Sequence, residues 1–165
     1  HRDGNTDVKE NLTAIFEGLL TIQRESGCAI VLPLHPRTKS KLSKNLDGAV
    51  YEQLLSNSLI KIIEPVGFLD VIALEKNSAM IITDSGGLQK EAFFFQKPCI
   101  ILRPQTEWVE IVENGNAILV GASKSKIEAA YQTLASKNDF TFPTLYGDGA
   151  AATFICEKII KALNE

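Results

Sequence analysis

Two kinds of apolar pattern alternate along the chain, and together they predict its secondary structure. Residues 11–23 carry apolar side chains at helical spacing and are followed by Gly27, a typical helix end. Short runs that are apolar at almost every position predict strands at residues 28–32, 59–63, 79–83, 98–102 and 117–120. Amphipathic stretches predict further helices at residues 38–55, 68–74, 88–95, 123–136 and 150–163.

This alternation predicts the fold class. Strands that are apolar throughout are typical of a parallel sheet covered by helices on both faces. We therefore expect an α/β fold with a doubly wound, Rossmann-like parallel sheet. The length of 165 residues suits a single domain, residues 1–165, and the sequence shows no internal repeat, low-complexity tract or long linker.

Composition narrows the classes of partner. The net charge of −3 provides no broad basic field for nucleic acid or an acidic membrane surface. No apolar run is long enough to cross a bilayer, and no signal peptide precedes the domain, so we expect no membrane association. The chain starts at a histidine rather than a methionine, which indicates a fragment or a processed product.

The cysteines point away from metal and redox chemistry. Cys28, Cys99 and Cys156 lie far apart and form no CxxC pair. Cys28 and Cys99 flank apolar runs, and we expect both to be buried as small hydrophobic side chains. Unpaired thiols favour a reducing compartment, so a cytoplasmic protein is expected.

Ligands of an open parallel sheet bind beyond the carboxyl ends of its strands. Polar or glycine-rich residues follow four of the predicted strands, at residues 33–37, 64–68, 83–87 and 103–108. These segments supply several candidate side chains, each with two interpretations. His35 is either a hydrogen-bonded turn residue or a ligand, and Arg37 caps a helix or serves a phosphate. Phe68 either packs in the core or closes a flat pocket over a base, and Arg103 can reach the same crevice.

The turn Ser85-Gly86-Gly87 joins a predicted strand directly to a helix. Free backbone N–H groups at a helix start bind an anion well, and glycines let a phosphate approach the backbone closely. In the alternative interpretation, Ser85 only caps the helix and the glycines only allow tight packing. The segment matches neither GxGxxG nor a P-loop, so it favours neither a nicotinamide site nor a Walker-type site.

Glu91 lies six residues after Ser85 on the same predicted helix. A carboxylate at this distance can accept both hydroxyls of a ribose whose phosphates lie at the helix start. The alternative is an ordinary solvated glutamate at the edge of an apolar stretch. These features together indicate a nucleotide diphosphate site, and they do not identify a reaction.

Residues 83–92, Thr-Asp-Ser-Gly-Gly-Leu-Gln-Lys-Glu-Ala, resemble the TDSGGxQxEA segment of the non-hydrolysing UDP-N-acetylglucosamine 2-epimerases. Four further segments resemble the same family in the same order. They are His1-Arg2 with Asn5, Leu34-His35-Pro36, Arg103 with Thr106-Glu107, and Tyr146-Gly147-Asp148-Gly149. The resemblance covers essentially the whole chain.

The resemblance implies one half of a glycosyltransferase-B-type fold, in which two Rossmann-like domains enclose the active site. This chain would be the C-terminal domain, with the N-terminal domain absent, and alone it is expected to fold but not to catalyse. The family's isomerases interconvert UDP-N-acetylglucosamine and UDP-N-acetylmannosamine by eliminating and re-adding UDP, without a redox cofactor or a metal. UDP and a UDP-N-acetyl sugar are thus the implied ligands, cell-surface polysaccharide biosynthesis the implied setting, and a homodimer of the full-length enzyme is left open.

The resemblance also implies roles for individual residues. His1 matches a catalytic histidine that faces the diphosphate, and His35 matches a histidine of a regulatory nucleotide-sugar site. The residues assigned to UDP are Ser85, Gly86, Gly87, Glu91, Phe68 and Arg103.

The chain departs from the family pattern at three places. Gly4 stands where the family usually has Glu, Lys90 replaces a frequent acid, and Trp108-Val109-Glu110 replaces Arg-Pro-Glu. The Thr-Glu-Trp-Val form of residues 106–109 resembles relatives that act on modified UDP-2-acetamido sugars such as diacetamido uronates. Three alternatives therefore stay open: an epimerase of such a sugar, the donor-binding domain of a glycosyltransferase, and a non-catalytic UDP-sugar sensing domain.

Overall fold

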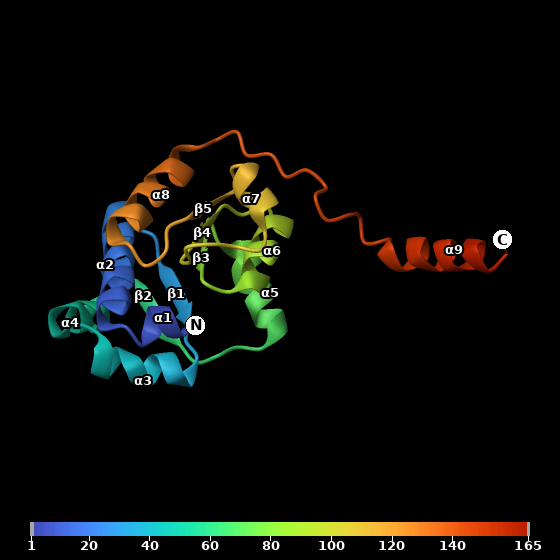
Figure 1. Cartoon of the computed structure of the whole chain (residues 1–165). Coiled ribbons are helices and arrows are strands. Elements are labelled where there is room, and N and C mark those ends of the chain that lie inside the picture. Colours follow the sequence, from blue (N-terminus) through green and yellow to red (C-terminus); the bar gives the residue numbers. More distant parts are fainter. Residues whose placement is uncertain (1, 165) are drawn as a thin grey trace.

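The computed structural model describes residues 2–164 as an α/β body with one helix standing away from it (Figure 1). The elements follow in the order α1 (Asp3–Thr6), α2 (Lys9–Ser26), β1 (Ile30–Pro33), α3 (Pro36–Asn45), α4 (Gly48–Ser56), β2 (Ile60–Ile63), α5 (Phe68–Asn77), β3 (Ile81–Thr83), α6 (Gly86–Phe94), β4 (Cys99–Ile101), α7 (Val109–Glu113), β5 (Ala117–Leu119), α8 (Lys124–Ser136) and α9 (Ala151–Leu163).

All strand pairings in the described residues are parallel, as predicted. β1 pairs with β2 in the register Ile30 to Ile60, and β4 lies between β3 and β5 with Cys99 opposite Ile81 and Ala117. The hydrogen-bonded ladders form two sheets, β1-β2 and β3-β4-β5, instead of the single sheet that we expected. The two sheets still share one apolar core, because partly buried side chains of β1 and β3 pack against the same cluster.

Helices cover the strands on two sides. In Figure 1, α2, α4 and α8 lie on one side and α5 and α6 on the other. β4 shows why both sides are needed: Ile100 and Ile101 are both 0% exposed, although successive strand residues point to opposite faces. On the first side α2 and α8 approach closely at Gly18, where an added Cβ would lie 3.0 Å from Cγ2 of Ile127.

β1 corrects the expectation that every strand is buried on both faces. Its residues alternate between intermediate burial and exposure, and Val31 is 42% exposed. Cys28 precedes this strand and is exposed, so the prediction that it is buried is wrong. Cys99 lies in the central strand β4 and is buried, as predicted. The two cysteines differ because Cys28 precedes a strand with one exposed face, whereas Cys99 lies within a strand that is covered on both faces.

The predicted helix at residues 38–55 is two helices, α3 and α4. Asp47 ends the continuity because its side chain accepts hydrogen bonds from the backbone N–H groups of Ala49 and Val50 and thereby caps α4. The short helices α1 and α7 were not predicted. α9 was predicted, and none of its residues, all of which are described, is buried. No helix within residues 2–164 is both long enough and apolar enough to cross a bilayer.

Candidate functional site

The turn between β3 and α6 carries the most distinctive chemistry of the chain. Ser85 occupies the N-cap position of α6 with an extended backbone, and its own N–H donates to Oγ1 of Thr83 over 3.0 Å. Among residues 2–164, no backbone N–H of α6 donates a capping hydrogen bond to the Ser85 hydroxyl. The interpretation of Ser85 as a plain helix cap therefore lacks its defining bond, and the hydroxyl can serve another partner.

The first backbone N–H groups of α6, at Gly86 and Gly87, have no intrahelical acceptor. An added Cβ on Gly87 would find no atom of the described chain nearer than 3.8 Å, the distance to Oγ of Ser85, with Oε1 of Glu91 at 4.0 Å. Gly87 is itself exposed. The start of α6 is thus open to solvent and flanked by a hydroxyl and a carboxylate, and the helix dipole makes it favourable for an anion.

Arg103 lies beside this helix start but is already paired. Its Nη1 donates to Oε2 of Glu107 over 2.7 Å, and its side chain is 14% exposed. A hydrogen bond from its own backbone N–H, and then the bond from Arg103, hold the pKa of Glu107 below its ordinary value. An added Cβ on Gly86 would lie only 2.3 Å from Oε1 of Glu107. An anion at this helix start therefore competes with Glu107 for the guanidinium.

A buried polar network fixes the turn from behind. Gln89 is 0% exposed, donates through Nε2 to the carbonyl of Ser85 over 3.1 Å, and accepts from Oγ1 of Thr106. The backbone N–H of Trp108 donates to that same hydroxyl, and the indole Nε1 donates to the carbonyl of Gly86 over 2.7 Å. Neither Gln89 nor Trp108 was predicted to position the turn, although a glutamine one turn after Ser85 next to an apolar helix face is a usable signal.

Lys90 and Trp108, two of the departures from the family pattern, contact each other. Nζ of Lys90 lies 4.7 Å from the ring centroid of Trp108 and 4.5 Å from that of Tyr146. A cation over aromatic faces is attracted by their quadrupoles. Tyr146 begins the last resembling segment, and burial first and Glu110 second raise the pKa of its hydroxyl to about 12. Three segments far apart in the sequence thus meet beside α6.

The beginning of the chain also reaches this turn. The backbone N–H of Arg2 donates to Oδ2 of Asp84 over 2.8 Å. The side chain of Asn5 donates to the same carboxylate oxygen and to the carbonyl of Leu102. His1, predicted as catalytic, lies outside the described residues. The neighbouring residue, Arg2, is bonded to Asp84, the residue that precedes Ser85.

The carboxyl groups of Glu75 and Glu91 contact each other beside the site, and only Glu91 was predicted as a site residue. Glu91 lies in the second turn of α6 and is partly exposed, whereas Glu75 of α5 is 3% exposed. Burial, reinforced by Glu91, raises the pKa of Glu75 to about 7. The contact joins residues on different helices, so local sequence patterns gave no signal for it.

Phe68 is the first residue of α5 and is 68% exposed, so the interpretation as a core residue is wrong. It precedes Glu75 by seven positions, or about two turns, and the two side chains therefore leave the same side of α5. His35 caps α3, because its Nδ1 accepts from the N–H of Arg37. Arg37 forms ion pairs with Asp3 at 2.9 Å and Asp7 at 2.8 Å, which occupy its guanidinium.

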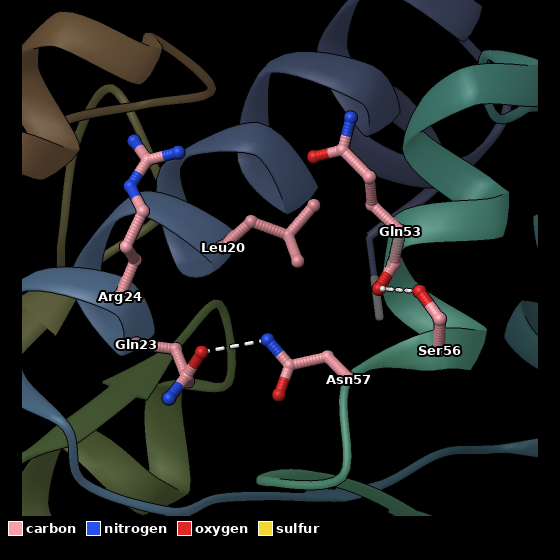
Figure 2. Close-up of a pocket in the computed structure, with 6 residues that line it drawn as sticks. All are labelled: Leu20, Gln23, Arg24, Gln53, Ser56 and Asn57. Atoms are coloured by element: carbon pink, nitrogen blue, oxygen red, sulfur yellow. Dashed lines mark hydrogen bonds between the residues drawn. The ribbon is translucent and has the colours of Figure 1, made fainter.

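A separate pocket of about 260 Å³ lies between α2 and α4 (Figure 2). Its lining residues are Leu20, Gln23, Arg24, Gln53, Ser56 and Asn57. Asn57 donates to the side chain of Gln23 over 2.6 Å, and Arg24 donates to Thr21. None of these residues was predicted as a site residue, and the bond between Asn57 and Gln23 ties the end of α4 to α2.

Parallel strands, flanking helices and a glycine turn at the carboxyl end of β3 define a Rossmann-like α/β domain. The family model described as UDP-N-acetylglucosamine 2-epimerase matches residues 1–161. The chain therefore belongs to the UDP-N-acetylglucosamine 2-epimerase family, as the resemblance of its motifs predicted.

Two curated relatives show how the match extends along the chain. The UDP-2,3-diacetamido-2,3-dideoxy-D-glucuronate 2-epimerase of Pseudomonas aeruginosa is 44% identical over 161 residues, which are 98% of this chain and 43% of that protein. The UDP-N-acetylglucosamine 2-epimerase of Methanocaldococcus jannaschii is 43% identical over 164 residues, 99% of this chain and 43% of that protein. The chain thus spans less than half the length of these relatives.

Solved structures agree with the fold. The M. jannaschii UDP-GlcNAc 2-epimerase matches with a TM-score of 0.87 and 41% identity over 98% of this chain and 44% of that chain. A second structure of that enzyme, in complex with UDP-GlcNAc and UDP, matches with a TM-score of 0.83 over 98% of this chain and 43% of that chain. The predicted fold class is confirmed.

Proposed function

We propose that this chain is the UDP-binding half of a UDP-N-acetylglucosamine 2-epimerase. One observation carries the proposal: the uncapped start of α6 lies beside Oε1 of Glu91, with only the exposed Gly87 between the Ser85 hydroxyl and that carboxylate. This arrangement offers donors for a diphosphate and, within two turns of the same helix, an acceptor for a ribose. The complex of the M. jannaschii relative with UDP-GlcNAc and UDP supports the same ligand class.

The proposed assignment follows the chemistry of each group. The Ser85 hydroxyl and the N–H groups of Gly86 and Gly87 donate to the diphosphate, and the Glu91 carboxylate accepts from the ribose hydroxyls. Phe68, exposed at the start of α5, covers the uracil ring. Arg103 turns from Glu107 to the diphosphate when the nucleotide is bound.

In the proposed reaction a base removes the proton from C2 of the sugar while the C1–O bond to UDP breaks, leaving a glycal with a C1=C2 double bond. UDP then adds back to C1 as C2 receives a proton on the opposite face. The donors at α6 stabilise the departing diphosphate. The acid–base groups at the sugar come from a part of the protein outside this chain, and the catalytic role that the resemblance implies for His1 belongs to the same proposal. No redox cofactor or metal enters this scheme.

Several further assignments belong to the same proposal. The full-length enzyme joins this domain to an N-terminal domain and can pair as a homodimer, and His35 serves a regulatory nucleotide-sugar site. Cys28 and Cys156 are free, exposed thiols, which fits a reducing compartment such as the cytoplasm.

Calorimetric titration of the 165-residue chain with UDP tests the binding step. Saturable binding that weakens in both Ser85→Ala and Glu91→Ala is expected, because each variant removes one partner of the nucleotide. A folded chain that binds no UDP, or variants that bind UDP as tightly as the unchanged chain, contradict the assignment. Turnover of UDP-N-acetylglucosamine by the full-length protein in heavy water should then place deuterium at C2. A glycosyltransferase or a sensing domain would bind UDP without this exchange.

A diacetamido uronate epimerase is the second candidate. The Pseudomonas aeruginosa relative named for that activity is 44% identical over 98% of this chain, and the Thr-Glu-Trp-Val segment at residues 106–109 resembles such enzymes. The two candidates predict different substrates for the same exchange at C2. Turnover of a UDP-diacetamido uronate with no turnover of UDP-N-acetylglucosamine would select the second candidate, and the reverse would select the first.

A further inference from the structure

Glu75 is the most deeply buried carboxyl group among the groups that surround the candidate site. Its side chain is 3% exposed, and each of its carboxylate oxygens is fully enclosed. In the described residues, no hydrogen-bond donor reaches either oxygen. An ionised carboxylate without donors is very costly to bury, so a glutamate at this position needs a proton or a partner.

The groups that face Glu75 show which of these it uses. Among the described residues, Glu91 of α6 acts on Glu75, and Glu75 in turn acts on Cys99 of β4. Burial first, and Glu75 second, raise the pKa of the Cys99 thiol to about 12, so this thiol stays neutral at working pH. Two carboxylates can only accept hydrogen bonds and repel each other, whereas a proton between them turns the contact into a short, charge-assisted bond.

The proton belongs on Glu75. Burial raises its pKa to about 7, with the negative charge of Glu91 adding to the effect. Glu91 is partly exposed and borders the open surface at Gly87. The ionised partner is therefore the one that faces the site, and the neutral partner is the one behind it.

We propose that Glu75 is a positioning residue, whose protonated carboxyl donates a hydrogen bond to the Glu91 carboxylate and holds it ready for the ribose hydroxyls of a nucleoside diphosphate. This inference rests on the proposed function, because it gives Glu91 the ribose. Ionisation of Glu75 breaks the bond and sets two negative charges against each other. The affinity of the site for the nucleotide therefore depends on pH through Glu75, a group that does not touch the ligand.

Three variants of the 165-residue chain separate positioning from simple space filling. Glu75→Gln is neutral at every pH and keeps a donor toward Glu91. Glu75→Met fills a similar volume without a donor. Glu91→Gln removes the proposed charge on the ribose side. Each variant is first compared with the unchanged chain by far-UV circular dichroism and thermal melting, which confirm that it is folded.

Calorimetric titration with UDP at pH 6 and pH 8.5 then gives the decisive comparison. We expect the affinity of the unchanged chain to fall between these values by about tenfold more than that of Glu75→Gln, the effect of one hydrogen bond to a charged group. The second ionisation of the UDP phosphate affects both chains equally, so it cancels in the difference. Glu75→Met should bind weakly at both pH values. Carbon-13 NMR of labelled glutamate should show Glu75 titrating far above an ordinary glutamate in the absence of UDP.

The outcomes separate the two proposals. Equal pH profiles for the unchanged chain and Glu75→Gln, or full affinity in Glu75→Met at pH 6, contradict the role of Glu75 and leave the UDP site intact. An ordinary titration of Glu75 contradicts its neutral form directly. A folded chain that binds no UDP at either pH contradicts the proposed function itself, and the positioning role is then lost with it.

Discussion

The indole of Trp108 donates a hydrogen bond to the backbone carbonyl of Gly86 over 2.7 Å. This bond ties the loop after β4 to the first turn of α6, the turn whose open N–H groups form the candidate diphosphate site. The same indole lies under the ammonium of Lys90, one helical turn further along α6. Trp108 therefore holds α6 at two successive turns, and the position of its first turn depends on a residue outside the helix.

Replacement of Trp108 by Phe should weaken UDP binding severalfold. The variant loses the bond to Gly86, which costs about 1 kcal/mol, but keeps an aromatic ring for Lys90 and Tyr146. Calorimetric titration with UDP measures the affinity. Tyr146→Phe is the matched control, because it removes a hydroxyl bonded to Glu110 and leaves Gly86 untouched. Equal losses of affinity in the two variants would argue against a specific role of the indole bond.

The two glycines of the turn should respond differently to alanine. In Gly86→Ala the new methyl group overlaps Oε1 of Glu107, 2.3 Å away, so Glu107 must shift and its pairing with Arg103 is disturbed. In Gly87→Ala the nearest described atom is 3.8 Å away. Gly87→Ala should therefore keep the melting temperature of the unchanged chain and still lose UDP affinity, because its methyl group occupies the approach of the phosphate. Unchanged affinity in a folded Gly87→Ala chain would mean that the ligand does not approach there.

Gln89→Leu should destabilise the chain by about 1–3 kcal/mol, because it removes the side-chain donor to the Ser85 carbonyl and leaves the hydroxyl proton of Thr106 without its acceptor. Urea unfolding gives this free energy. Thr106→Val removes the hydroxyl that donates to Gln89, so the double variant should cost less than the sum of the two single variants. Additive losses would show that the network does not act as a unit.

The free energy of unfolding should fall as the pH rises from about 4.5 to about 7. The pKa of Glu75 is raised from an ordinary value of 4.5, which applies to the unfolded chain, to about 7 in the folded chain. The folded state thus binds the proton more tightly, so its stabilising effect is complete at low pH and is lost as the pH rises through the folded value. The shift corresponds to about 3 kcal/mol. Chemical unfolding at pH 5 and pH 8 captures most of it, and Glu75→Gln should show a correspondingly smaller difference between the two pH values.

Local pattern predicted most of the fold, and its failure at residues 38–55 has a clear physical cause. Apolar residues recur every four positions and are all buried at Leu42, Leu46, Val50 and Leu54. The apolar period therefore continues across the point where α3 ends and α4 begins. Only Asp47 marks the start of the second helix, by capping it. A period describes which side chains face the core, and two helices packed on one core can share it.

The candidate site was likewise predicted mainly where its residues lie close together in the sequence. Ser85, Gly86, Gly87 and Glu91 were predicted together because they follow one another on a single turn and helix, and their roles remain predictions. Glu75 and Trp108 act on that turn from other elements, through contacts that only the folded chain creates. His35 was identified as a possible turn residue, and the structure places it at such a position, as the cap of α3.

The separation of α9 from the body has a consequence for the cooperativity of unfolding. None of the residues of α9, all of them described, is buried, so its helix–coil equilibrium is not coupled to the packing of the sheets (Figure 1). An isolated helix of 13 residues is only marginally stable in water. Its ellipticity should therefore fade gradually on warming, before the sharp transition of the body. A two-state fit to far-UV data on this chain would then understate the enthalpy of the domain, whereas the fluorescence of Trp108 follows the body alone.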